Sequence, residues 1–151
     1  MGSKLIAVIQ RVKSCSVSID NEVHSKINKG VLVLLGIENE DNMDTIKYIV
    51  HKIIKLRIFG DSQGKMNLSV NDVDGSIMVV SQFTLCGDTK KGNRPSYIKA
   101  MPPKQSKSIY DSFLDYIKSC YSKVESGIFQ ANMDIGLVND GPVTLIVRST
   151  N

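Results

Sequence analysis

Several residue types on which many enzymes and metalloproteins depend are scarce in this sequence. The 151 residues include no tryptophan, two histidines and three cysteines. Because Cys15, Cys86 and Cys120 are odd in number and far apart, they argue against a disulfide framework and against a zinc site. We therefore expect reduced thiols, as in a cytosolic protein, with no bound metal and no other cofactor.

Long apolar runs and a strong excess of one charge are absent as well. The longest apolar run, residues 31–35, is far shorter than the roughly 20 residues that cross a bilayer, and no secretory leader pattern opens the sequence. These features predict a cytoplasmic protein that does not associate with membranes. The formal net charge of +4 permits a nucleic-acid partner without requiring one.

Common catalytic motifs are also missing. The sequence contains no G-x-S-x-G, no phosphate-binding P-loop, no G-x-G-x-x-G and no H-E-x-x-H. His24 lies in a predicted strand and His51 in a predicted helix, where a surface or packed histidine is the ordinary role. A Ser-His-Asp hydrolase is therefore hard to assemble, and we expect a protein that works without a charged catalytic side chain.

The pattern of apolar residues predicts one α+β domain that covers residues 1–151. Alternation or continuous apolar runs predict strands, and an i, i+3, i+4 spacing predicts helices. The predicted strands cover 4–20, 22–27, 31–37 and 76–85. One predicted helix covers 41–59, with Asp41, Asn42 and Asp44 as cap candidates, and a second follows prolines 102 and 103. Hairpins connect most strands, so we expect a largely antiparallel or mixed sheet with two or three helices.

A final strand pair is predicted around the stretch Asn-Asp-Gly-Pro at 139–142. Asp-Gly is typical of a hairpin turn. A plain hairpin does not need the proline that follows, because proline cannot donate to a sheet and restricts the residue before it. The ordinary explanation is a trans proline at the start of a strand, since only about 5–6% of X–Pro bonds are cis. The alternative is a Gly-Pro backbone held for a function.

Polar residues end the predicted strand over 76–85. Ser81, Gln82 and Thr84 follow an apolar run, with Phe83 among them. Either the strand runs out into solvent, or its end forms a small polar pocket where free backbone N–H groups could bind an oxyanion. The loop that follows carries Lys90, Lys91 and Arg94 within residues 86–96; such a loop is usually solvated, yet in this position it could bind phosphates.

Together these segments resemble the D-aminoacyl-tRNA deacylases almost from end to end. The similarity runs through 7–12, 64–70, 79–85, 88–96 and 139–144. Two signature stretches, S-Q-F-T and N-x-G-P-x-T, are both intact, at 81–84 and 139–144. The differences are peripheral; for example, Cys86 stands where many relatives have an aromatic residue.

The resemblance implies a cytosolic homodimer that hydrolyses the ester between a D-amino acid, or mischarged glycine, and its tRNA. This activity is a chiral proofreading step. The backbone around Phe83 and Thr84 would hold the developing oxyanion, while the 2′-OH of the 3′-terminal adenosine assists the chemistry. Thr84 as a covalent nucleophile is a rival mechanism, which lacks a base that the sequence can name.

The resemblance also implies a set of substrate-binding residues. Ser81 and Gln82 would orient the terminal adenosine or the hydrogen bonds of the pocket, and Phe129 and Met133 would line the adenine site. A cis Gly141–Pro142 pair would reach into the active site of the opposite subunit and reject L-amino acids. Two alternatives stay open: a non-catalytic nucleic-acid-binding module, and a small-molecule hydrolase that uses Thr84.

Overall fold

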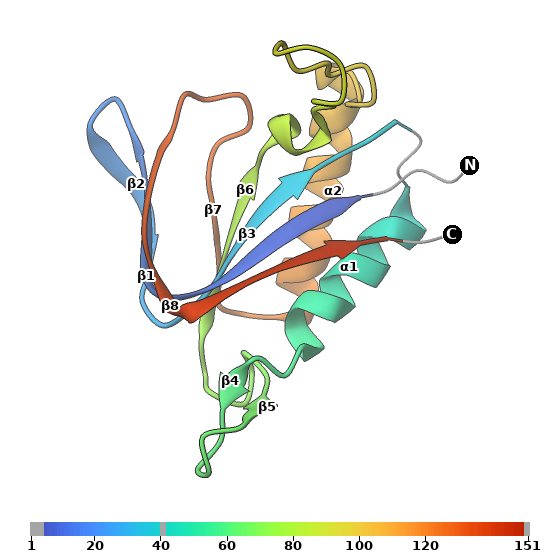
Figure 1. The fold of residues 1–151 in the computed structure, drawn as a ribbon. Helices are drawn as coiled ribbons and strands as arrows, with labels where there is room; N and C mark the ends of the chain where they lie inside the picture. Colours follow the sequence, from blue (N-terminus) through green and yellow to red (C-terminus); the bar gives the residue numbers. More distant parts are fainter. Residues whose placement is uncertain (1–4, 40–41, 150–151) are drawn as a thin grey trace.

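The computed structural model describes residues 5–39 and 42–149, which form a large mixed β-sheet, a two-stranded sheet and two α-helices (Figure 1). The large sheet consists of β1 (Ile6–Ile19), β2 (Glu22–Ile27), β3 (Gly30–Gly36), β6 (Ser76–Ser81), β7 (Val124–Ser126) and β8 (Asp134–Arg148). The remaining elements are β4 (Phe59–Gly60), β5 (Met66–Leu68), α1 (Met43–Lys55), α2 (Pro103–Cys120) and the 3₁₀-helix η1 (Phe83–Cys86). The predicted α+β class is therefore confirmed.

The large sheet is organised around β1. This strand pairs antiparallel with β3 through its first half, with β2 through its second half and with β8 along most of its length. β3 and β6 are parallel, as are β6 and β7, and the strand order is β2-β1-β3-β6-β7. Both senses of pairing occur, so the sheet is mixed, as expected.

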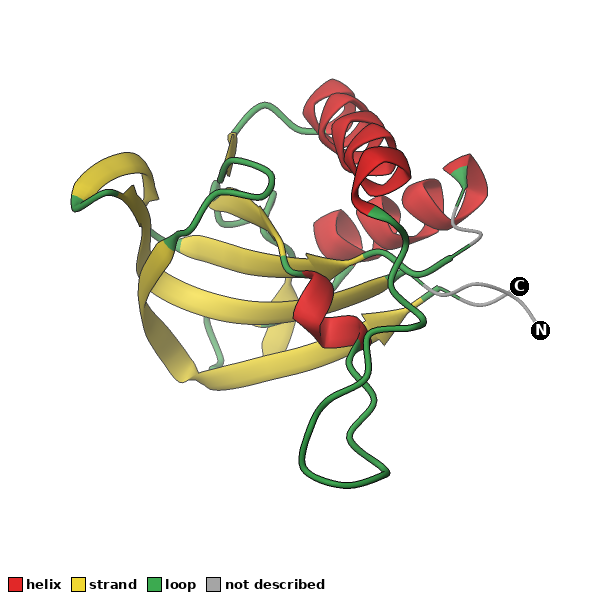
Figure 2. Ribbon diagram, turned by 90° about the horizontal axis from the view of Figure 1, so that it is seen from above, coloured by secondary structure: helices red, strands yellow, loops and turns green. Residues whose placement is uncertain are grey.

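Both α-helices cover one face of the sheet (Figure 2), and the larger hydrophobic core lies between these two layers. Val31, Val33 and Leu35 of β3 belong to this core, whereas Leu32 joins a smaller cluster on the opposite face. β3 is thus buried on both faces, as its continuous apolar run predicts. Neither described α-helix is long and apolar enough to cross a membrane.

A capping box starts α1. The Asn42 side chain accepts hydrogen bonds from the backbone N–H groups of Asp44 (2.9 Å) and Thr45 (3.3 Å), and the Thr45 hydroxyl accepts one from Asn42 N (3.1 Å). Asn42 is therefore confirmed as the cap. Asp44 lies in the first turn, where an acidic side chain interacts favourably with the helix dipole. Asp41, the third candidate, lies outside the described residues.

The predicted strand over 76–85 is wrong in its last four residues. β6 ends at Ser81, although Gln82 N still donates to Leu35 O across the sheet (2.7 Å). The chain then turns tightly, because Leu85 N donates to Gln82 O (3.2 Å). Local turn bonds replace the sheet ladder at this point, so the polar residues leave the sheet instead of alternating across it.

The predicted hairpin at 139–142 is wrong too. β8 continues through these residues as one bent strand and pairs with β1 on both sides of them. Within this ladder Arg11 alone stands opposite residues 140–143, so the extra residues of β8 form a bulge. Asn139 Oδ1 accepts a hydrogen bond from Val143 N (2.9 Å) across the bulge. The Asp-Gly-Pro sequence therefore bends the strand without reversing it.

Candidate active site

A cleft of about 800 Å³ lies at the carboxyl end of β6. Its walls come from η1, from the segment that leads into α2 and from the loop that precedes β8. The residues predicted from the sequence that line it are Ser81, Gln82, Phe83, Thr84, Phe129 and Met133. The structure thus brings the S-Q-F-T stretch together with two side chains from a distant part of the sequence.

The turn after β6 leaves two backbone N–H groups without an acceptor among the described residues. In the described part of the chain, neither Phe83 N nor Thr84 N donates a hydrogen bond to another protein atom. The Thr84 hydroxyl accepts a hydrogen bond from Gln82 Nε2 (3.1 Å), which holds both side chains at the cleft. Free N–H groups beside a substrate carbonyl can stabilise the negative charge that develops on its oxygen.

Uncharged side chains form the cleft wall as far as the structure describes it. Among the described residues that line it, none is His, Asp, Glu, Lys, Arg or Cys. Behind the wall, the Tyr110 ring packs against Phe129 with centroids 5.6 Å apart, and burial raises the pKa of Tyr110 to about 12. The cleft therefore offers backbone and neutral polar groups instead of a carboxylate, an imidazole or an amine.

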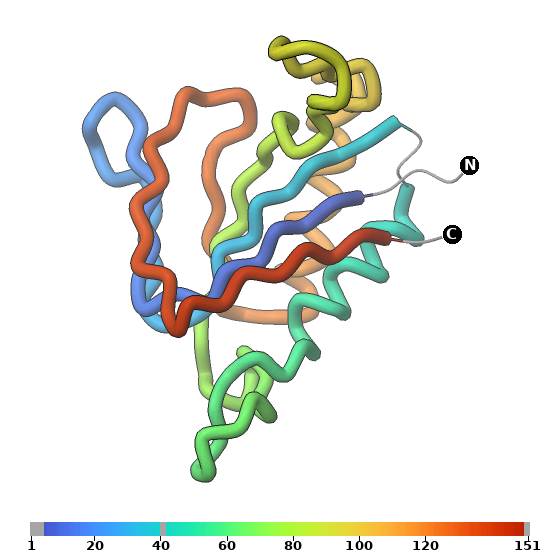
Figure 3. The backbone as a smooth tube through the Cα atoms, viewed as in Figure 1, coloured from blue at the N-terminus to red at the C-terminus, as the bar shows by residue number. Residues whose placement is uncertain are grey.

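Gly141 and Pro142, the other two predicted site residues, do not lie on this cleft. They belong to the bulge of β8, where the strand bends at the end of the sheet opposite η1 (Figure 3). Both residues are exposed, and the peptide bond between them is cis. Within one chain the two signature stretches are therefore far apart.

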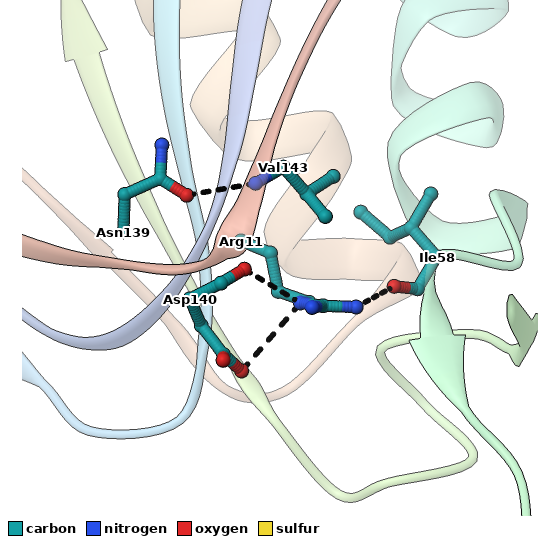
Figure 4. Close-up of polar contacts among 5 residues, drawn as sticks. All are labelled: Arg11, Ile58, Asn139, Asp140 and Val143. Carbon is teal, nitrogen blue, oxygen red and sulfur yellow. Dashed lines mark hydrogen bonds and ion pairs between the residues drawn. The ribbon is translucent and has the colours of Figure 1, made fainter. Parts of the chain in front are cut away.

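Arg11 holds the bulge against the body of the protein (Figure 4). Its Nε donates to Asp140 O (3.0 Å) and lies 3.5 Å from the Asp140 carboxylate, while its Nη1 donates to Ile58 O (2.6 Å). The Arg11 side chain is only 14% exposed and that of Asp140 is 32% exposed, so these interactions are partly shielded from solvent. Together with the Asn139–Val143 bond, they fix the backbone on both sides of Gly141.

Comparison with known proteins gives the family. A sequence model of the family described as D-Tyr-tRNA(Tyr) deacylase matches residues 8–148. This chain belongs to that family.

Full-length relatives agree with this assignment. The D-aminoacyl-tRNA deacylase of Thermosipho africanus (strain TCF52B) is 52% identical over 143 residues, which are 95% of this chain and 96% of that protein. The D-aminoacyl-tRNA deacylase of Flavobacterium psychrophilum (strain ATCC 49511 / DSM 21280 / CIP 103535 / JIP02/86) is 53% identical over 145 residues, with 95% and 97% covered. The similarity thus includes both signature stretches and the strands that carry them.

Two solved structures share the fold. A c-Myc DNA unwinding element binding protein superposes with a TM-score of 0.92 at 41% identity, covering 97% of this chain and 99% of the other. A probable eukaryotic D-amino acid tRNA deacylase superposes with a TM-score of 0.82 at 16% identity, covering 97% and 100%. At that lower identity the likeness concerns the fold alone.

This member of the deacylase family has cleft residues that the sequence did not reveal. Tyr97 lies edge-on to Phe83, with ring centroids 5.1 Å apart. Ser106, in the first turn of α2, also lines the cleft, and its exposed fraction is only 6%. Prolines 102 and 103 line it too, although the sequence marked them only as a helix start. The two prolines were the only sequence feature that pointed to this part of the cleft. The approach of α2 to β6 is a long-range contact, which a local pattern does not reveal.

Proposed function

We propose that this chain hydrolyses the ester bond between a D-amino acid and the 3′-terminal adenosine of tRNA, and that mischarged glycine is a further substrate. The observation that carries the proposal is a cleft with two unpaired backbone N–H groups, at Phe83 and Thr84, and no charged side chain on its described wall. Such a site suits an ester whose hydrolysis needs oxyanion stabilisation and no strong side-chain base. The names of the family and of its relatives support the same substrate class.

The proposed reaction is direct attack of water on the ester carbonyl. The new bond joins the water oxygen to the carbonyl carbon, and the N–H groups of Phe83 and Thr84 stabilise the oxyanion. The bond to the ribose 3′-oxygen then breaks, and that oxygen takes up the proton that the attacking water loses, with the help of the neighbouring 2′-OH. The products are a free amino acid and tRNA with its terminal hydroxyl restored.

Steric exclusion by main chain is the proposed basis of chiral selection. If the amino group and the ester carbonyl are both fixed, the side chain and the α-hydrogen exchange places between D and L isomers. Rigid carbonyl groups of Gly141 and Pro142 beside the α-carbon would leave room for hydrogen but not for a side chain. Glycine would also pass, because it has no side chain to exclude.

The Gly141–Pro142 pair would come from a second copy of the chain, in a homodimer. In one chain this pair is exposed and does not line the cleft, so only another copy can supply it there. β8 also exposes apolar side chains, including Val138 (52% exposed) and Ile146 (62%), and in the described residues it pairs only with β1. An exposed apolar edge strand favours burial against a partner.

The first test compares the two isomers of one substrate. We expect the purified protein to hydrolyse D-Tyr-tRNA faster than L-Tyr-tRNA by at least about tenfold, because excluding a side chain exceeds the discrimination from one methylene group. The measurement is loss of labelled amino acid from tRNA at equal substrate concentrations. Equal hydrolysis of both isomers, or of neither, would contradict the proposal.

The second test separates the two mechanisms. The Thr84→Ala variant should retain hydrolysis of D-Tyr-tRNA within about tenfold, because the backbone N–H of residue 84 remains and only one hydrogen bond is lost. A D-Tyr-tRNA ending in 2′-deoxyadenosine should instead be hydrolysed much more slowly by the unmodified protein. A Thr84→Ser variant is the matched control. Complete loss in Thr84→Ala with retention in Thr84→Ser, together with undiminished hydrolysis of the 2′-deoxyadenosine substrate, would contradict the backbone mechanism and favour Thr84 as the nucleophile.

A non-catalytic nucleic-acid-binding role is the second candidate. The solved structure named as a c-Myc DNA unwinding element binding protein, at 41% identity, favours it. This role predicts salt-dependent binding of DNA or RNA with the ester bond left intact. The isomer comparison above separates the two candidates, because only the first releases the amino acid.

A further inference from the structure

An exposed basic loop lies beside the cleft and has no role in the mechanism above. Residues 88–99, called the basic loop here, contain four cations and one carboxylate, and the cations are Lys90, Lys91, Arg94 and Lys99. The ion pairs found in the described residues are those of Arg11, Lys107 and Lys123, so no cation of the basic loop is paired. Asp88, its only carboxylate, accepts a hydrogen bond from Lys90 N (2.9 Å) and is held at the start of the loop.

The base of the loop is fixed, whereas its tip is surrounded by solvent. Asp88 and Ser96 exchange two backbone hydrogen bonds, of 2.7 and 2.9 Å. Further along, Asn39 N donates to Lys99 O (3.0 Å) and thereby ties the loop to the segment that follows β3. Residues 89–99 are all exposed, and the loop projects beyond both layers of the fold (Figure 2). The cations are therefore presented from a defined position next to the cleft.

Apolar and aromatic side chains connect the loop to the cleft. Tyr97 lines the cleft and lies edge-on to Phe83, whose side chain is 56% exposed. Ile98, the next residue, is 82% exposed. Exposed rings and apolar surface next to unpaired cations are the combination that binds single-stranded nucleic acid, because bases stack on the rings while cations contact phosphates.

We infer that the basic loop binds the single-stranded 3′ end of tRNA, through the phosphates of the nucleotides that precede the terminal adenosine. This inference rests on the proposed function, which places the terminal adenosine in the cleft. The RNA strand would then leave the cleft past Phe83 and Tyr97, beside the basic loop. Lys90, Lys91 and Arg94 would contact phosphates in a way that does not depend on base identity.

The experiment compares two substrates that carry the same ester. D-Tyr-tRNA has the phosphate chain, whereas 3′-O-D-tyrosyl-adenosine has no phosphate. In the variant Lys90→Ser/Lys91→Ser/Arg94→Ser we expect kcat/KM for D-Tyr-tRNA to fall by about tenfold or more, with hydrolysis of the adenosine ester unchanged. The slope of log Kd against log salt for tRNA should decrease by about 2, because the variant removes three phosphate contacts and each contact of a single strand contributes roughly 0.7.

A matched control removes the same charge elsewhere. Lys47, Lys52 and Lys55 lie on α1, away from the cleft lining, and Lys47→Ser/Lys52→Ser/Lys55→Ser should leave both substrates and the salt slope unchanged. The inference is overturned if the loop variant loses both substrates equally, if it keeps full activity on tRNA, or if the α1 variant loses as much. Failure of the unmodified protein to hydrolyse either ester would instead contradict the proposed function. The inference about the basic loop would then be tested by tRNA binding alone, through the difference in salt slope between the loop variant and the unmodified protein.

Discussion

Replacing Gly141 with alanine is expected to lower kcat/KM for D-Tyr-tRNA by about 100-fold, because small displacements of positioning groups have effects of that size. Gly141 has φ +123°, a backbone conformation that L-residues rarely adopt. An added Cβ would lie 2.5 Å from Arg11 Nη2 and 3.1 Å from Val143 Cγ2. The new methyl group therefore disturbs both the backbone and the Arg11 contacts that hold the carbonyl groups of Gly141 and Pro142, which are called the carbonyl wall here.

Loss of folding should not explain this effect. A residue in an unfavourable backbone conformation costs of the order of 1–3 kcal/mol, which is smaller than the typical ~5–15 kcal/mol free energy of unfolding of a domain. The matched control is Gly64→Ala, since Gly64 also has positive φ (+76°) but an added Cβ meets no atom within 4 Å. Thermal unfolding should show modest destabilisation of both variants, larger for Gly141→Ala because its added Cβ meets Arg11 and Val143, with activity lost only in that variant.

Exclusion of side chains by the carbonyl wall predicts a second effect of Gly141→Ala, on chiral selection. The ratio of D-Tyr-tRNA to L-Tyr-tRNA hydrolysis should also fall, because a displaced wall no longer separates a hydrogen from a side chain. Measuring both isomers with Gly141→Ala supplies this ratio. A variant with unchanged rate and unchanged ratio would show that the bulge of β8 takes no part in selection.

The sequence predicted well those elements whose own side chains decide their structure. The strand over 22–27 matches β2, and the central run over 31–37 matches β3 within one residue at each end. The pattern of β3 is strong because both of its faces meet apolar clusters, and β2 lies between two stretches of turn residues, at 20–21 and 28–30. The cap at Asn42 is a similar case, since its hydrogen bonds involve residues two and three positions away.

The wrong prediction of a hairpin at 139–142 concerns a place where distant residues override a local signal. Asp-Gly favours a hairpin, but β1 pairs with β8 on both sides of the bulge, and Arg11 binds Asp140 O within it. The ladder with β1 therefore determines the direction of the chain. The end of β6 has a different cause, because there a local hydrogen bond from Leu85 N to Gln82 O turns the chain out of the sheet. Propensity is a weak guide where tertiary hydrogen bonds compete with it.

For the candidate site, the sequence could supply residues that belong to short, recognisable stretches. It predicted the four residues 81–84 together with Phe129 and Met133, which all line the cleft. It could not supply Ser106 or Tyr97, since neither belongs to a motif and both reach the cleft through long-range packing. The separation of residues 141 and 142 from the cleft is also a property of the fold, because sequence distance says nothing about which end of a sheet a bend occupies.

Two separately inactive variants should restore activity when they share a dimer. The first is Gly141→Ala, which alters the bulge but leaves the cleft intact. The second is Ala131→Trp, because Ala131 lines the cleft and an indole there would fill the space meant for substrate. Each homodimer should retain only about one hundredth of the unmodified activity. Heterodimers, coexpressed and purified through two different affinity tags, should regain about half of it, since one of the two sites of a C2 dimer is then intact.

This result depends on the two signature stretches acting across the dimer. In the heterodimer, the open cleft belongs to the chain with the altered bulge, and the intact bulge belongs to the chain with the blocked cleft. If the bulge acted on the cleft of its own chain, neither site would be complete, and the heterodimer would stay as inactive as both parents. Recovery therefore requires that residues 141 and 142 of one copy complete the cleft of the other. A heterodimer of Gly64→Ala with Ala131→Trp is the control, because it should show the same half activity under either arrangement.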